Sequence, residues 1–245
     1  MTTTMKTFKH LLTTTLIAAS TAVLAQNTTV IIKTDSSVST TRYHKSVNRV
    51  TSDFSMYIGL NNFGGSMPTG YDFRPLGSRF VALAWQKRIP LSVKGATKLR
   101  LVTGPEVAWN NFMFERSADA GRNILVERNN QLSIEQSDVD LRKSKLVIAQ
   151  LNLPVMFNLS FRSGLTLGLG AYAGIRLDSY TKVKPVGGSS VRDHGSYNLN
   201  TIRWGLTSEL GFRGSAKMFF RYEPNSPFKT GQGPDASVWA VGLKL

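Results

Sequence analysis

Three observations in the sequence predict an eight-stranded antiparallel up-and-down transmembrane β-barrel with long outer loops and short periplasmic turns. Eight segments alternate apolar and polar residues with a period of two, which is typical of strands that have one apolar face. The connections between these segments are alternately long and short, as in barrels of the bacterial outer membrane. The N-terminal segment has the features of a secretory signal peptide.

Composition narrows the class of protein. The chain has 245 residues, 41% of them hydrophobic and 18% charged, which fits one compact domain. Outside the N-terminus there is no run of about 18 apolar residues, so a bundle of membrane-spanning helices is excluded. The absence of Cys excludes disulfides, thiolate zinc sites and thiol nucleophiles. The formal charge of +15 comes from scattered basic residues without a dense run, so we predict no nucleic-acid partner.

Residues 1–25 are predicted to be a signal peptide that is cleaved after Ala25. Lys6 and Lys9 precede an apolar core, and Val23-Leu24-Ala25 lies directly before the predicted cleavage point. An anchoring helix is the alternative, but the core is short and is interrupted by three threonines at 13–15. Residues 26–52 then form a polar periplasmic lead-in, and residues 53–245 form the barrel. We therefore expect export to the bacterial outer membrane.

The first four strands are predicted over residues 53–63, 78–89, 97–114 and 143–158. In each, large apolar side chains occupy one face and polar or small side chains the other. The apolar face consists of Phe54, Met56, Ile58, Leu60, Val81, Leu83, Trp85, Leu99, Leu101, Val107, Trp109, Val147, Leu151, Val155 and Phe157. Pro105 and Pro154 have no N–H to donate to a strand ladder, so we expect a bulge or an irregularity at both.

The last four strands are predicted over residues 164–183, 199–213, 215–223 and 236–245. The first of them has the clearest alternation in the chain, with Leu165, Leu167 and Leu169 opposite Gly168 and Gly170. Long connections are predicted at 64–77, 115–142, 184–198 and 224–235, and short ones at 90–96, 159–163 and Gly214. An even number of strands returns both ends of the barrel to the periplasmic side.

Whether the apolar face points inward or outward distinguishes a soluble barrel from a membrane barrel. In a soluble lipocalin-like barrel the apolar side chains point inward, whereas a membrane barrel presents them to lipid and has a polar lumen. The opposite face mixes glycines with charges of both signs, which fits a crowded lumen in which the charges pair. The predicted lumen charge network is structural and consists of Arg88, Glu106, Arg176, Asp178, Arg203, Glu209 and Arg221.

Aromatic residues are predicted to form two girdles at the membrane interfaces. We place Trp109, Phe112, Phe114 and Tyr180 near the outer strand ends, and Trp85, Phe157 and Phe212 near the inner strand ends. The alternative is that these aromatics pack in the core of a soluble barrel.

The sequence offers little that indicates catalysis. His194 is adjacent to Asp193, with Ser189, Ser190 and Ser196 nearby, but neighbours in one loop do not establish the geometry of a hydrolytic triad. Glu106 and Glu209 fit charge pairing with lumen arginines better than a role as acid and base. His residues are few and no calcium-loop pattern is present. We therefore predict no enzymatic activity, no metal and no cofactor.

Several segments are similar to a known family. These are GPEVAWNNFMF (104–114), KLVIAQLNLPVMF (145–157), GAYAGIRLDSYTKVK (170–184), RWGLTSELGFR (203–213) and GPDASVWAVGLKL (233–245). In this order, and over residues 50–245, the chain resembles the PorT-like outer-membrane β-barrel proteins of Bacteroidetes-type bacteria. The resemblance implies a small barrel without an assigned activity. One departure is that the chain ends on Leu245, where many outer-membrane barrels end on an aromatic residue.

The expected function is a structural or surface-interaction role through the extracellular loops. The loop at 115–142 carries a mixed-charge surface made of Glu115, Arg116, Asp119, Arg122, Glu127, Arg128, Glu135, Asp138 and Asp140. Expected partners are membrane lipid, anionic lipid head groups, the outer-membrane assembly machinery and a surface partner of unknown kind. Three alternatives stay open: a narrow pore for small solutes, a lipid-modifying hydrolase at the surface, and a soluble periplasmic binding barrel.

Overall fold

The computed structural model describes residues 49–65, 73–74, 76–93, 95–117, 121–128 and 131–245. The predicted signal peptide and residues 26–48 of the predicted lead-in lie outside these residues. Thr51 and Ser52, the end of the predicted lead-in, already belong to the first strand. Within the described residues, no helix has the length and apolar character needed to cross a membrane.

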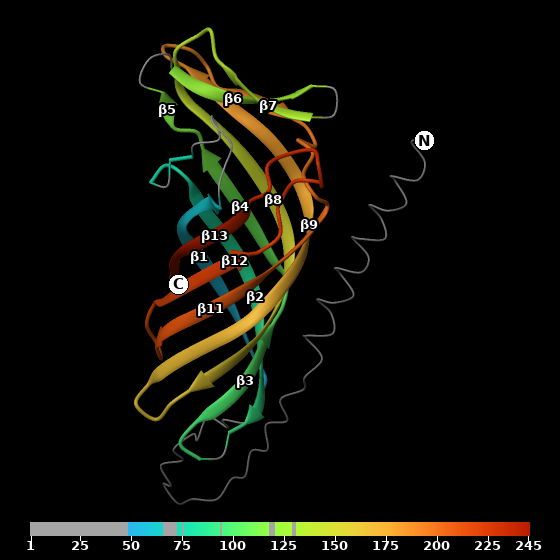
Figure 1. Cartoon of the computed structure of the whole chain (residues 1–245). Coiled ribbons are helices and arrows are strands. Elements are labelled where there is room, and N and C mark those ends of the chain that lie inside the picture. Colours follow the sequence, from blue (N-terminus) through green and yellow to red (C-terminus); the bar gives the residue numbers. More distant parts are fainter. Residues whose placement is uncertain (1–48, 66–72, 75, 94, 118–120, 129–130) are drawn as a thin grey trace, which may run out of the picture. The chain divides into compact units, whose positions relative to one another are not determined.

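Eight antiparallel strands close into a ring (Figure 1). They are β1 (Thr51–Gly64), β2 (Arg79–Ser92), a third strand in two parts, β3 (Lys98–Thr103) and β4 (Glu106–Met113), then β8 (Leu141–Ser160), β9 (Leu165–Pro185), β11 (Ile202–Phe212), β12 (Lys217–Glu223) and β13 (Ser237–Lys244). Each strand pairs with the next, and β13 pairs with β1 to close the ring. This confirms the predicted up-and-down order, and each predicted segment overlaps one strand.

The strand registers give the stagger of the ring. Starting at Thr51 on β1, the direct cross-strand partners lead through Arg88, Val102, Met156, Gly170, Thr207, Arg221 and Ala240 back to β1 at Asn61. The path therefore returns ten residues further along the same strand, from position 51 to position 61. Such a stagger in eight strands requires a tilt of about 40° to the barrel axis and leaves an interior that side chains can fill.

The two strand prolines belong to one irregularity. Gly104 and Pro105 interrupt the third strand between β3 and β4, as predicted for Pro105. Pairing of β8 with β3 ends at Val155 and its pairing with β4 resumes at Asn152, so Pro154 lies opposite the interruption. The irregularity expected at Pro154 therefore lies in the pairing of β8 with the third strand, whereas Pro154 pairs regularly with Tyr172 of β9. The missing N–H of Pro154 leaves β8 regular because the neighbouring strand has no ladder at that point.

The outer face of the ring is apolar. Phe54 is 63% exposed, whereas its neighbour Ser55 is 3% exposed. The same alternation recurs on the other strands, so most of the apolar side chains predicted to share one face are exposed. Val147 is an exception, because it is only 1% exposed and residues 146–150 of β8 are all buried. We call the exposed apolar side chains the apolar belt; its large exposed members include Phe54, Ile58, Trp85, Leu153, Val155, Phe157, Leu169, Ile175, Leu177, Trp204, Leu206, Phe212, Phe220 and Leu243.

The two ends of the ring differ in their connections. At one end, which we call the short-turn end, β8 and β9 are joined by residues 161–164 and β11 and β12 by residues 213–216. Gly164 and Gly214 have φ values of +92° and +81° in these turns, a conformation that glycine adopts without strain. The opposite end, the long-loop end, has additional strands: β5 (Arg116–Ser117), β6 (Gly121–Arg128), β7 (Gln131–Gln136) and β10 (Val191–His194).

The interior has two apolar clusters. The larger lies at the long-loop end and contains Phe63, Phe73, Phe112, Phe114, Leu125, Leu146, Ile148, Tyr197, Leu199, Phe228, Ala236 and Val238, which we call the aromatic core. The rings of Phe63 and Phe112 stack with their centroids 4.2 Å apart. The smaller cluster is built around Tyr57, Phe80 and Phe219, together with small alanines. Between and below these clusters the interior is polar.

Candidate functional site

Charged side chains meet in the middle of the barrel. Glu106 on β4 and Arg221 on β12 form a bidentate pair, in which Arg221 Nη1 and Nη2 each lie 2.6 Å from one carboxylate oxygen. Both side chains are almost completely buried. Asn152 Nδ2 donates a further hydrogen bond to Glu106 Oε1 at 3.1 Å. A bidentate arginine–carboxylate pair is directional, so it fixes the relative position of two strands on opposite sides of the lumen.

Arg221 is also enclosed by aromatic rings. Its guanidinium carbon lies 4.8 Å from the ring centroid of Tyr57, 5.0 Å from that of Phe80 and 5.2 Å from that of Tyr172. The faces of aromatic rings attract cations, and this attraction is stronger where water is excluded. The aromatic rings and Glu106 together compensate for the loss of hydration of the buried guanidinium.

A second group links four strands toward the short-turn end. Lys244 Nζ on β13 donates to both oxygens of Glu209 on β11, at 2.8 and 2.9 Å, and to Gln86 Oε1 on β2 at 2.7 Å. Tyr57 Oη on β1 donates to Glu209 at 2.7 Å and accepts a hydrogen bond from Gln86 Nε2, also at 2.7 Å. These four buried residues satisfy one another's polar atoms.

A third group pairs Arg203 on β11 with Glu223 on β12. Arg203 Nε donates to Glu223 Oε2 at 2.8 Å, and Arg203 Nη2 contacts the same oxygen. Tyr172 Oη on β9 donates to Glu223 Oε1 at 2.9 Å. Above these three groups, Asn61 donates to Asn110, and Asn110 donates to Gln150. Side chains from all eight strands therefore occupy the lumen below the aromatic core.

The seven predicted lumen charges have different surroundings. Glu106, Arg203, Glu209 and Arg221 are buried and paired inside the barrel. Arg88 lies nearer the short-turn end, where its Nε is 2.7 Å from Asp53 Oδ2 and both side chains are partly exposed. Arg176 is half-buried and donates to Ser179 Oγ at 2.7 Å.

The prediction for Asp178 is wrong. The register of β8 against β9 pairs Gln150 with Arg176 but Ala149 with Asp178, so Leu177 is an extra residue in a bulge. A bulge changes which face the following residues occupy. Asp178 therefore lies on the outer surface, where its Oδ1 is 3.2 Å from His194 Nδ1.

Six members of the three groups were not part of the predicted lumen charge network. They are Tyr57, Gln86, Asn152, Tyr172, Glu223 and Lys244. Tyr57, Glu223 and Lys244 lie on the polar face of their segments, so strand alternation alone indicates that they point inward. Tyr172 gives a weaker signal because its neighbours at 171 and 173 are alanines.

Two of the predicted interfacial aromatics are inside the barrel. Phe112 and Phe114 are completely buried in the aromatic core, so their prediction as membrane-interface residues is wrong. Phe112 and Phe114 have the same parity as Glu106 and Asn110, which point inward, and the opposite parity to Trp109. Trp85, Phe157 and Phe212 are exposed on the apolar belt, while Trp109 and Tyr180 are half-buried.

The loop residues considered for hydrolysis do not assemble into a triad. His194 contacts Asp178 rather than the adjacent Asp193, whose backbone and side-chain oxygens accept hydrogen bonds from Tyr197 Oη. Ser196 Oγ donates to Glu127 Oε2 at 3.3 Å. Among the described residues, no group of three or more histidines and acids is arranged to hold a metal ion.

The long-loop end is extended by a folded hairpin. β6 and β7 pair along their length from Asn123–Gln136 to Arg128–Gln131, and Figure 1 shows them beside the far ends of β8 and β9. Leu125 of β6 is part of the aromatic core, and Leu132 and Ile134 of β7 pack against it. Burial of these side chains anchors the hairpin on the barrel. The predicted loop 115–142 is therefore largely a structured element.

Basic residues line up on the outer face of the extended strands. Lys145 on β8 is directly opposite Lys182 on β9, and Lys182 is directly opposite Arg192 on β10. Lys143 and Lys184 form the next pair along the same face. We call Lys143, Lys145, Lys182, Lys184 and Arg192 the basic face. Like charges directly opposite one another destabilise a sheet, so this arrangement calls for anionic compensation.

Lys145 shows the electrostatic cost of the basic face. It lies beyond the apolar belt, and its Nζ donates to Asn111 Oδ1 at 2.8 Å. Partial burial and the nearby charges of Lys182, Lys143 and Arg192 lower the pKa of Lys145. An anion bound across these side chains would remove part of the repulsion.

No protein-family model matches the chain, and no curated protein matches it. Among solved structures, the chain is similar to two crystal structures of Ail, the attachment invasion locus protein of Yersinia pestis. One of these is a complex with the heparin analogue sucrose octasulfate. The TM-scores are 0.34 and 0.33, with 11% identity in each match, over 79% of this chain and 97% of that chain. A likeness of this size does not indicate what this chain binds.

Proposed function

We propose that the protein is a non-enzymatic barrel of the bacterial outer membrane that interacts with surface components through its long-loop end. The observation that carries the proposal is the distribution of polarity: a closed ring with an apolar exterior and ion pairs inside. In water this large apolar surface would stay exposed, which is unfavourable, whereas in a membrane the apolar belt would contact the lipid hydrocarbon. The inverse arrangement, an apolar interior and polar exterior, is what a soluble binding barrel needs.

Export and orientation form part of the same proposal. A cleaved signal peptide at 1–25 delivers the chain, and the assembly machinery inserts it with the short-turn end in the periplasm. Membership in the PorT-like family rests on the segments quoted above and is proposed with it.

The experiment that tests membrane insertion is fractionation of cells that express the full chain. We expect the protein in the detergent-soluble outer-membrane fraction, with faster gel mobility before boiling than after it, because a closed barrel binds less detergent than the unfolded chain. Recovery in the soluble periplasmic fraction without a heat-dependent shift would overturn the proposal and leave the soluble binding barrel.

The surface interaction that the geometry supports best is with anionic lipid head groups. The basic face begins above the apolar belt, at the level where head groups of the outer leaflet would lie. Each Lys or Arg near an anionic membrane surface contributes about 1 kcal/mol of binding. The repulsion between Lys145, Lys182 and Arg192 makes phosphate groups the matching chemistry.

This interaction is tested by titrating a diphosphorylated lipid into the protein in zwitterionic nanodiscs. The Lys145→Gln/Lys182→Gln double variant should bind it about thirtyfold more weakly than the wild type, since two cations contribute about 2 kcal/mol. Lys87→Gln, on the outer face of β2 toward the short-turn end, is the matched control and should bind as the wild type does. Equal affinity of the double variant would remove the basic face from the proposal.

A narrow pore is the alternative, and the interior argues against it. The Glu106–Arg221 and Arg203–Glu223 pairs lie in the lumen, with the aromatic core above them. An eight-stranded barrel has room for side chains but little more. Planar-bilayer recordings should therefore show no steady single-channel openings; steady openings would favour the pore.

A further inference from the structure

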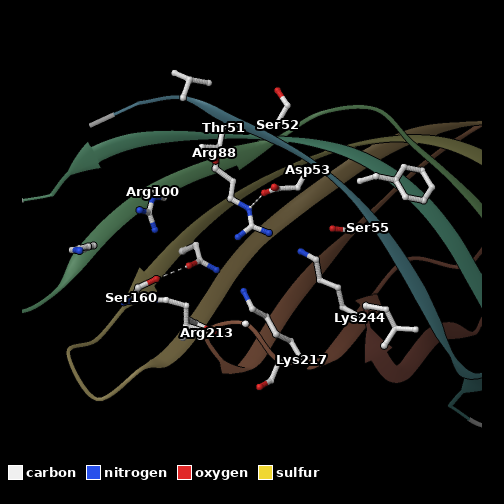
Figure 2. A pocket seen from close by; sticks show the side chains of 18 of the residues that line it. Thr51, Ser52, Asp53, Ser55, Arg88, Arg100, Ser160, Arg213, Lys217 and Lys244 are labelled. Carbon is white, nitrogen blue, oxygen red and sulfur yellow. Dashed lines mark hydrogen bonds and ion pairs between the residues drawn. The ribbon is translucent and has the colours of Figure 1, made fainter. Parts of the chain in front are cut away.

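A large cavity opens at the short-turn end of the barrel, at the far end from the basic face. It has a volume of about 1030 Å³ and is lined by residues of β1, β2, β3, β8, β9, β12 and β13 and by the turn between β11 and β12. Figure 2 shows side chains from these strands pointing into the same space. Such a volume is in the range of sites that bind small molecules. We call this cavity the vestibule.

The vestibule has a large excess of positive charge. Seven Arg and Lys side chains line it, among them Arg88, Arg100, Arg213, Lys217 and Lys244, which are labelled in Figure 2. Asp53 is the one acidic side chain among the described lining residues. The basic side chains therefore exceed the acidic one by six. A concave, low-dielectric wall of one sign of charge concentrates ions of the opposite sign.

Part of this charge is already compensated within the protein. Asp53 pairs with Arg88, and Glu209 pairs with Lys244. Glu209 also accepts the hydrogen bond from Tyr57, so its oxygens are occupied by these partners. Arg100 and Arg213 belong to the cations that remain, and their guanidinium groups suit planar, two-point contact with phosphate or sulfate oxygens.

Lys217 is the observation that points to a ligand. Its residue is only 9% exposed, and its side chain lines the vestibule. Among the described residues, its ammonium group has neither a hydrogen bond nor an ion pair within 4 Å, and its direct cross-strand partner is another cation, Lys244. Gly211 leaves room for it, since a Cβ there would lie 2.8 Å from Lys217 Cγ. Glu209 and Asp53 are the carboxylates nearby that attract this ammonium group, but neither forms an ion pair with it. An anion that enters the vestibule would supply the direct acceptor that Lys217 does not have among the described residues.

We propose that the vestibule is a binding site for a multiply charged oxyanion, of the phosphate or sulfate class, held by Lys217, Arg213 and Arg100. The ligand would enter from the short-turn end, and the hydroxyl of Ser55 lies among the lining residues as a further hydrogen-bond donor. The hydroxyls of Ser160 and Thr166 also line the vestibule, but they already donate to Asn158 Oδ1 and to the carbonyl of Gly211. This site is separate from the basic face and does not depend on the proposed surface role. Its ligand would be either a soluble oligophosphate or a phosphorylated head group at the membrane edge.

The test is a calorimetric titration of tripolyphosphate into the full-length protein in zwitterionic detergent micelles. Lys217→Gln and Arg213→Gln should each weaken binding by about tenfold, the effect of losing one charge-assisted contact. Lys229→Gln, in the exposed connection between β12 and β13, is the matched control and should bind as the wild type does. Heat-modifiable gel mobility of each variant shows that its barrel is closed.

Two outcomes would overturn the proposal. One is no tripolyphosphate binding by the wild-type protein. The other is binding that stays unchanged in both Lys217→Gln and Arg213→Gln while these variants remain folded. Arg213 is exposed, so its replacement should leave folding intact even if Lys217→Gln does not fold.

A second arm distinguishes the two sources of the anion. The titration is repeated in nanodiscs of phosphatidylcholine alone and in nanodiscs that also contain phosphatidylglycerol. If the wild type binds tripolyphosphate more weakly in the anionic discs, and Lys217→Gln shows no such difference between the two kinds of disc, the site is assigned to a lipid head group. Equal binding in both kinds of disc assigns it to a soluble anion. If the binding-site proposal fails, the proposal of membrane insertion still stands, because cell fractionation tests membrane insertion separately.

Discussion

The two halves of the barrel interior are stabilised in different ways. Toward the short-turn end, strands are joined by ion pairs such as Lys244–Glu209 and Glu106–Arg221, and the vestibule lies below them. Toward the long-loop end, Phe63, Phe112 and other aromatics pack into a buried apolar core. An apolar core tolerates substitutions that conserve its volume, whereas a buried ion pair is destabilised when either partner is removed. The charged half therefore specifies register, and the aromatic half supports the added hairpin.

The largest loss of stability should come from removing one partner of the Glu106–Arg221 pair. Glu106→Gln leaves Arg221 buried without its carboxylate, which should lower the free energy of unfolding by about 3–5 kcal/mol. Urea unfolding in detergent micelles, followed by heat-modifiable gel mobility, measures this loss. A loss below 1 kcal/mol would mean that the charged half does not hold the ring together.

Leu146→Ala probes the aromatic half by the same measurement. Leu146 is completely buried in the aromatic core, so the cavity left by truncation should cost about 3 kcal/mol. Leu206→Ala on the apolar belt is the matched control, because this side chain is half exposed and faces detergent in the folded state. Equal losses in the two variants would contradict the assignment of inside and outside.

Gly104→Ala tests the junction of β3 and β4. Gly104 has φ of +148°, and an added Cβ would lie 2.0 Å from the carbonyl oxygen of Trp85. Strain and displacement of the backbone should cost about 2 kcal/mol. Gly95→Ala is the control, since Gly95 also has positive φ but nothing lies within 4 Å of the added Cβ. Unfolding midpoints that shift equally would show that the close approach to Trp85 is unimportant.

Asp53→Asn should have the smallest effect on stability. The Asp53–Arg88 pair is partly exposed, with Asp53 at 43%, so its loss should cost less than about 1 kcal/mol. The same change removes the acidic side chain of the vestibule and should strengthen tripolyphosphate binding. Weaker binding in Asp53→Asn would contradict the electrostatic account of the vestibule.

The strands could be predicted because each has one face toward an apolar surrounding and one toward a polar lumen. The period of two is then visible in the sequence, as in Leu165–Leu169, and it also indicates which residues point into the lumen. Parity would also have placed Phe112 inside. Composition alone misplaces Phe112, because an aromatic residue near a strand end is equally typical of a membrane-interface girdle.

Other features leave weaker signals. The bulge at Leu177 moves Asp178 to the outer surface, and nothing in the alternation around it marks the extra residue. The β6–β7 hairpin lies in a segment rich in both charges, where Leu125, Leu132 and Ile134 are too few to indicate its packing. The vestibule depends on the strand ends of the whole ring, which only the closed register brings together.

The residues around Lys244 also bear on how the barrel is completed. β13 and β1 meet only at the seam of the ring, where Leu245 N donates to Met56 O at 2.8 Å. Lys244 spans this seam by binding Gln86 on one side and Glu209 on the other. If the sheet entered the bilayer before β1 and β13 paired, Lys244 and Glu209 would be exposed to lipid without all of their partners. Pairing of β1 with β13 and burial of these charges therefore occur together. We expect the chain to insert into the bilayer only as a closed barrel.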